Sequence, residues 1–172
     1  MSRIKIYRAP AGALAIALSA LALAAVALTV QPVTRAGETS NRDPLPTVEV
    51  YQSPTCGCCT LWVDHLRDEG FTVNAHMVDD RRLTQIKIDA GLTRELASCH
   101  TGIVDGYVVE GHVPAEDVAR MLRERPDIAG IAVPGMPIGS PGMEVGDRRD
   151  PYDVLAFDRD GNVTVYASHH RD

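Results

Sequence analysis

Three of the four cysteines in this chain, Cys56, Cys58 and Cys59, lie within four residues, and no other feature restricts its fold and chemistry as strongly. The apolar run at 48–51 is typical of a strand, and the turn at 53–55 is followed by apolar residues at helical spacing. The thiols therefore lie where a strand leads into the first turn of a helix. There, unpaired backbone amides and the helix dipole favour thiolate, the form that attacks disulfides and binds soft metals.

The Cys-Gly-Cys-Cys motif supports more than one chemistry. Cys56 and Cys59 form a CxxC pair that can cycle between dithiol and disulfide. Cys58 is surplus to that cycle, and together with Cys56, Cys59 and the distant Cys99 it makes a four-thiolate set suited to Cu(I), Zn(II) or an iron–sulfur cluster. A purely structural interpretation has two disulfides, for example Cys56–Cys59 and Cys58–Cys99.

The N-terminal region is typical of an export or anchoring segment. Arg3, Lys5 and Arg8 precede residues 13–30, which carry no charge. This run is longer than the apolar core of about 7–15 residues in a signal peptide and shorter than the about 20 residues of a spanning helix. Residues 1–36 are therefore either a signal peptide or a membrane anchor, and both alternatives place the rest of the chain in the periplasm or another extracytoplasmic space. Thiols there are oxidised or held by a metal.

Composition then separates a linker from an acidic domain. Residues 37–46 are polar and rich in turn-forming residues, which predicts a linker, and we expect one domain over 47–172. Four of the 17 Lys and Arg residues and none of the 23 Asp and Glu residues fall within 1–36, which leaves 13 basic against 23 acidic residues and a net charge of −10 for the remainder. This charge argues against nucleic acid as a partner, because phosphate binding needs a basic face.

After the cysteine motif, the pattern alternates between helix and strand spacing. Cys59, Trp62, Val63 and Leu66 should form the buried face of a first helix that stops at Gly70. Further along we expect a strand at 71–78, a helix from near 81 to 91, a hairpin around the turn at 105–106, a helix from 114, an ordered Gly/Pro-rich loop over 129–146, and a second hairpin with strands at 154–158 and 162–166.

This order of elements predicts an α/β, thioredoxin-like fold: a glutaredoxin-type βαβαββα core with a C-terminal Gly/Pro/Met loop and β-hairpin. In that fold a cis-proline begins the third strand and lies opposite the CxxC motif. Here the loop entering the third strand contains Ser98, Cys99 and His100 and no proline. We therefore expect the thiol of Cys99 to face the other three.

Other side chains have two interpretations each. His100 is either a polar strand residue or a ligand or base, and Met136 and Met143 are either packing residues or thioether ligands. On the second strand we expect Met77 to point inward and His76 outward. His112, His169 and His170 are weaker ligand candidates. Trp62 is expected to be a core anchor under the cysteine motif.

Several motifs together resemble the CopG-type family of copper-resistance proteins. They are Ser-Pro-Thr-Cys-Gly-Cys-Cys at 53–59, Leu-Ala-Ser-Cys-His-Thr at 96–101, Val-Glu-Gly-His-Val-Pro-Ala at 109–115, the Gly/Pro/Met segment at 130–143, and Asp-Pro-Tyr-Asp-Val at 150–154. The resemblance spans roughly residues 47–169. It implies a thioredoxin-like fold, an extracytoplasmic location, and copper bound by Cys56, Cys58, Cys59 and Cys99. His100, Met136 and Met143 match further motif positions.

The sequence thus predicts an extracytoplasmic copper-binding protein for copper resistance or homeostasis, with Cu(I) held by the CGCC motif and the fourth cysteine and with a Cu(I)/Cu(II) redox cycle as an extension. The alternatives are a thiol-disulfide oxidoreductase that uses Cys56 and Cys59, and a zinc-structured interaction module. Whether it is a copper or thiol oxidoreductase stays open at this stage. The partners implied are copper ions, a redox partner, a membrane tether through residues 13–30, and a second copy of the chain sharing the cluster.

Overall fold

The computed structural model describes residues 45–171. The export or anchor segment expected at 1–36, the tether at 13–30 within it, and most of the linker expected at 37–46 lie outside these residues. Within the described part, no helix is long and apolar enough to cross a membrane.

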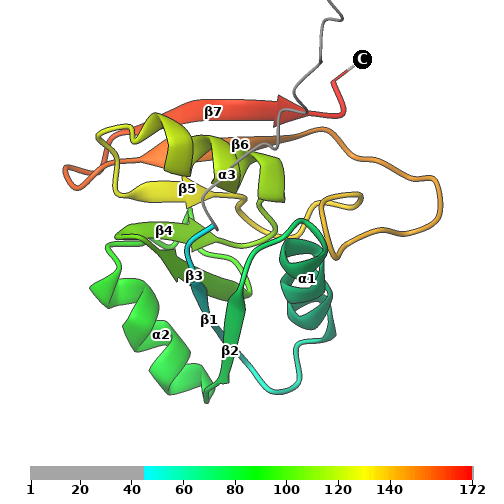
Figure 1. Cartoon of the computed structure of the whole chain (residues 1–172), viewed down its shortest axis with the longest axis horizontal. Helices are drawn as coiled ribbons and strands as arrows, with labels where there is room; N and C mark the ends of the chain where they lie inside the picture. Colours follow the sequence, from blue (N-terminus) through cyan, green and yellow to red (C-terminus); the bar gives the residue numbers. More distant parts are fainter. Residues whose placement is uncertain (1–44, 172) are drawn as a thin grey trace, which may run out of the picture. The chain divides into compact units, whose positions relative to one another are not determined.

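Residues 45–171 form a mixed α/β fold with one seven-stranded sheet, in the order β2-β1-β3-β4-β5-β6-β7 (Figure 1). β1 pairs in parallel with β2 and β4 with β5, whereas the other neighbours are antiparallel. The strands are β1 (Val48–Gln52), β2 (Val73–Met77), β3 (His100–Val104), β4 (Tyr107–Glu110), β5 (Gly130–Ala132), β6 (Tyr152–Phe157) and β7 (Val163–His169).

Three helices cover this sheet: α1 (Gly57–Asp68), α2 (Asp80–Asp89) and α3 (Ala115–Glu124). The predicted inner face of α1 is confirmed, since all four of its apolar side chains are buried. α2 begins at Asp80, within a residue of the predicted start, and the Asp79 side chain caps it by accepting a hydrogen bond of 2.8 Å from the backbone N–H of Arg82.

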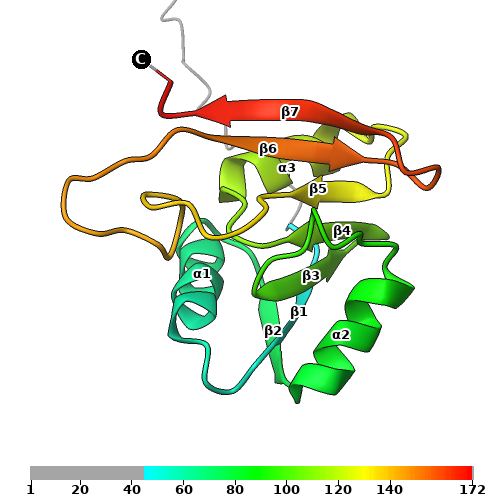
Figure 2. The ribbon, with the colours of Figure 1, turned by 180° about the vertical axis from the view of Figure 1, so that it is seen from behind.

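The sheet separates two hydrophobic cores. Val109 of β4 and Ile131 of β5 belong to the larger core, which also contains Trp62 of α1 and Met121 of α3. The neighbouring strand residues, such as Val108, alternate to the other face and form the smaller core, where the chain after α2 packs. α1 and α3 therefore cover one face and α2 the other, and Figures 1 and 2 show α1 and α2 on opposite sides of β1 to β3.

The prediction of a loop over all of 129–146 is wrong at its start. Gly130–Ala132 form β5, which pairs with β4 on one side and β6 on the other. Three residues that are buried on both faces show no alternation, so a periodicity argument cannot detect them. This short strand joins the predicted C-terminal hairpin, β6 and β7, to the main sheet, and the remaining loop at 133–151 extends past α1.

Candidate metal centre

The cysteine motif lies at the N-terminus of α1. Cys56 occupies the N-cap position, and Cys58 and Cys59 fall in the first turn, with Cys59 fully buried and Cys58 half-buried. In the described part of the chain, the Cys56 side chain makes no capping hydrogen bond to this end of the helix. Its unpaired amides and dipole are therefore available to stabilise negative charge on the sulfurs.

Cys99 lies beside this motif. The sulfurs of Cys56, Cys58, Cys59 and Cys99 all lie within 4.8 Å of one another. The predicted proximity of the fourth thiol is thus confirmed, although its role as a ligand stays a prediction. Since all four sulfurs belong to one chain, the cluster needs no second copy to assemble.

Two of the four sulfurs are oxidised in this structure. Cys56 and Cys59 form a disulfide, and Cys58 and Cys99 are free thiols. The Cys58 sulfur lies 3.5 Å from that of Cys56. Burial, and secondarily the neighbouring Cys58, raise the pKa of Cys99 to about 12, so this thiol keeps its proton at neutral pH unless a metal displaces it.

Two histidines complete the surroundings of Cys99. The Cys99 sulfur lies 3.3 Å from Nδ1 of His100 and 3.2 Å from Nε2 of His112. These three residues form a second group whose ligand atoms are close enough to hold a metal ion. Both histidines are buried. Burial lowers the pKa of both rings, well below the usual value in His100, which keeps the imidazoles neutral and able to bind a metal.

The tautomer of His112 follows from its second contact. Its Nδ1 lies 2.8 Å from the carbonyl oxygen of Pro141, which only accepts, so Nδ1 carries the proton. The lone pair of Nε2 therefore points toward Cys99. Nε2 of His100, in contrast, is buried and has no hydrogen-bond partner among residues 45–171.

The contact between His112 and Cys99 was missed in the sequence analysis, where His112 was one of the weaker ligand candidates. The predicted turn at 105–106 sets the register of the β3–β4 hairpin, and the structure pairs Thr101 with Glu110. Continuing this antiparallel register by two residues puts Cys99 opposite His112. A register count from the turn is the signal that identifies the contact in advance.

The loop with the two methionines reaches the site through its backbone. Gly142 packs on the first turn of α1, so closely that a Cβ there would lie 2.9 Å from the carbonyl oxygen of Cys58 and 2.9 Å from the backbone nitrogen of Trp62. Met143 follows directly and is half-buried, whereas the side chain of Met136 is 52% exposed. The ligand role of both methionines stays a prediction.

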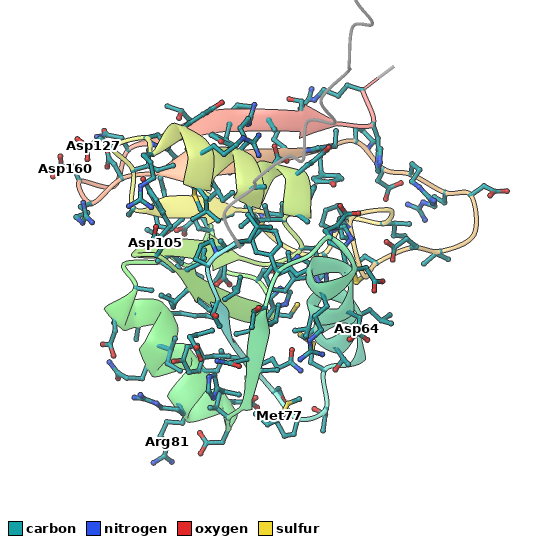
Figure 3. The ribbon with its side chains drawn as sticks, viewed as in Figure 1. Asp64, Met77, Arg81, Asp105, Asp127 and Asp160 are labelled. Carbon is teal, nitrogen blue, oxygen red and sulfur yellow. A yellow bond between two sulfur atoms is a disulfide. The ribbon has the colours of Figure 1, made fainter. Side chains whose placement is uncertain are left out.

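The remaining sequence candidates lie apart from the thiols or in the core. Trp62 is fully buried and its Nε1 donates a 2.8 Å hydrogen bond to the carbonyl oxygen of Val113, as expected of a core anchor. Met77 lies on the same face of β2 as the buried Val73 and pairs with Gln52 of β1, but the burial expected of it is wrong: it is 54% exposed, because it ends an edge strand (Figure 3). His76 is exposed as expected.

At the other end of the described chain, His169 lies 2.7 Å from a carboxylate oxygen of Asp117 and stacks on Tyr152. Glu116, Asp117 and His169 form a third group of possible metal ligands whose ligand atoms lie within 4.8 Å of one another. His170 packs edge-on against Tyr152. Neither histidine is among the residues that surround the thiols.

Comparison with known proteins agrees with this geometry. A family model described as "Protein of unknown function, DUF411" matches residues 96–143, which include Cys99, both buried histidines and both loop methionines. Two solved forms of a copper resistance protein, CopG, are 46% identical to the chain, cover 73% of it and are themselves covered over 98% of their length, with TM-scores of 0.68 and 0.69. This chain belongs to the CopG family. No curated protein gives a match. Membership in the CopG family, together with the four gathered sulfurs, supports a copper-related function.

Proposed function

We propose that this protein is an extracytoplasmic copper-binding protein of a copper-resistance system, and that it holds Cu(I) through Cys56, Cys58, Cys59 and Cys99. The observation that carries the proposal is the gathering of four sulfurs from two separate chain segments within 4.8 Å. Thiolates are soft ligands that match Cu(I), and the helix N-terminus favours the deprotonated form of the three thiols at the start of α1.

The fold supports the proposal. The order β1-α1-β2-α2-β3-β4-α3 and the strand order β2-β1-β3-β4 are those expected of a thioredoxin-like core. In such a core the start of α1 and the loop entering β3 face each other, which is where the two cysteine segments lie. The loop after β5 then adds the Pro141 carbonyl, which holds His112, and Gly142, which packs on α1 directly before Met143.

The disulfide extends the proposal to redox chemistry. Oxidation of two thiols to the Cys56–Cys59 disulfide releases two electrons and, from neutral thiols, two protons; these electrons reduce two Cu(II) ions to Cu(I). An external dithiol that becomes a disulfide then returns both electrons and protons to the Cys56–Cys59 pair. In this cycle the protein converts Cu(II) to Cu(I) and keeps the product on soft ligands.

The first test is Cu(I) binding by competition with a colorimetric chelator, on protein reduced under anaerobic conditions. We expect tight binding by the unaltered chain, and weaker binding with fewer copper ions per chain in the C58S and C99S variants. Unchanged affinity and stoichiometry in both variants would contradict the four-thiolate site. Replacement of a distant exposed residue, for example Glu124→Gln, provides the control.

The disulfide also favours a second candidate function, thiol-disulfide exchange by Cys56 and Cys59. Reduction of insulin by metal-free protein tests it. Turnover that survives the C58S and C99S substitutions would assign the site to disulfide exchange, whereas no turnover would leave copper as its substrate.

A further inference from the structure

Glu110, the last residue of β4, has an unusual position for a carboxylate. Its side chain is fully buried, and that of Lys87 from α2 is only 13% exposed. One carboxylate oxygen, Oε1, accepts hydrogen bonds from Lys87 Nζ at 2.5 Å and from the backbone N–H of Ser98 at 2.5 Å. The other, Oε2, accepts from the hydroxyl of Thr101 at 2.7 Å.

These contacts surround the fourth cysteine. Ser98 precedes Cys99 directly, and Thr101 follows it by two residues. The single carboxylate of Glu110 therefore holds the chain on both sides of Cys99. Lys87 strengthens the arrangement, because its ammonium group also donates to the Thr101 hydroxyl at 2.9 Å.

Stability alone does not explain this arrangement. Placing an ion pair in a protein interior costs desolvation energy, and an apolar pair of similar volume often serves the fold as well or better. The carboxylate instead fixes a conformation. Three donors converge on its two oxygens, and these hydrogen bonds hold the backbone of the loop that enters β3 in one position. The thiol on that loop must meet the three thiols of α1 with the accuracy of a few tenths of an ångström that metal ligation demands.

We infer that Glu110, neutralised by Lys87, is a positioning residue for Cys99 that holds this thiol against the Cys-Gly-Cys-Cys motif. The effect on copper rests on the proposed function, whereas the effect on the Cys99 loop does not.

Two double variants isolate the hydrogen bonds from the charge. In K87M/E110Q both charges are gone, but the glutamine oxygen still accepts from Ser98 and its amide still donates to the Thr101 hydroxyl. In K87M/E110M the charges are equally absent and no acceptor remains. Neither variant leaves a buried ion without its partner, and both keep a side chain of similar length, so both should fold.

The first measurement needs no copper. Amide hydrogen exchange of the segment 98–101 is compared in the two full-length variants, oxidised and metal-free. We expect exchange to be faster in K87M/E110M than in K87M/E110Q, while the core strand β1 exchanges alike in both. Equal exchange of the segment in the two variants would overturn the inference.

The second measurement is Cu(I) affinity of the reduced variants, with Cys99 present or replaced by serine. Because supporting partners of a ligand typically change metal affinity about 10–100-fold, we expect K87M/E110M to bind Cu(I) about that much more weakly than K87M/E110Q. This difference should vanish in the C99S background, and an equal loss with and without Cys99 would show general damage and overturn the inference. If the unaltered chain binds no Cu(I), the proposed function fails, and the exchange experiment still decides the role of Glu110.

Discussion

The contact between the methionine-bearing loop and α1 leads to a sharp prediction at Gly142. This residue has φ +83° and lies on the first turn of α1, with Cys58 O and Trp62 N each 2.9 Å from the position of an added Cβ. Both neighbours are backbone atoms of a helix and cannot rotate away. Substitution of Gly142 by alanine must therefore move the loop or strain it.

Gly135 supplies a matched control in the same loop. Its φ is +70°, so an alanine there meets the same backbone penalty, but no atom of the described residues lies within 4 Å of the added Cβ. The left-handed conformation costs an L-residue about 1–2 kcal/mol, which is the whole effect expected for G135A. Overpacking adds about 1–3 kcal/mol, so G142A should lower the free energy of unfolding by about 2–5 kcal/mol.

Urea denaturation of the two variants measures this difference. We expect a lower midpoint for G142A than for G135A at an unchanged m-value, because the change acts on the native loop and leaves the exposed area of the unfolded chain as it was. Copper affinity should fall further in G142A as well, since the displaced segment carries Met143 and the Pro141 carbonyl that orients His112. Equal midpoints for the two variants would refute the close approach on which this reasoning depends.

Three further predictions concern the body of the fold and the disulfide. Burial lowers the pKa of His65, whose ring nitrogen accepts a hydrogen bond from the backbone N–H of Ala115. The contribution of His65 to stability is therefore present above pH 6.5 and is lost as the pH falls. The free energy of unfolding, measured from pH 7.5 to 5, should change less with pH in H65Q, because the glutamine oxygen accepts the same bond without titrating. The W62F substitution should cost about 2–4 kcal/mol by thermal or urea unfolding, because it removes buried volume and leaves a buried carbonyl without its donor, and a loss below 0.5 kcal/mol would contradict the packing. Reducing the Cys56–Cys59 disulfide should raise the number of Cu(I) ions bound per chain, as measured by titration before and after treatment with a metal-free phosphine. An unchanged number would contradict a role of Cys56 and Cys59 in Cu(I) binding.

Much of the first half of the fold follows from local pattern. The apolar spacing of α1, the Asp79 cap of α2 and the glycine turn between β3 and β4 each depend on residues close in sequence, and the structure has all three. Three other features were beyond such rules. β5 is too short to show a period, Met77 lies on an edge strand that is mostly exposed, and the approach of Gly142 to α1 joins segments about 80 residues apart.

The candidate site divides in the same way. The sequence by itself determined that three thiols meet at a helix N-terminus, because motif, turn and helix are contiguous and their geometry is local. The register of the β3–β4 hairpin puts His112 beside Cys99, but only the tertiary structure decided that Pro141 orients His112 and that Glu110 holds the Cys99 loop with help from α2. These contacts depend on strand register and on helix packing over the sheet, and burial then sets the protonation of the histidines and of Cys99. Composition and residue spacing do not specify distances between side chains far apart in sequence. The contacts of Glu110 and Pro141 could therefore be identified only in the folded chain.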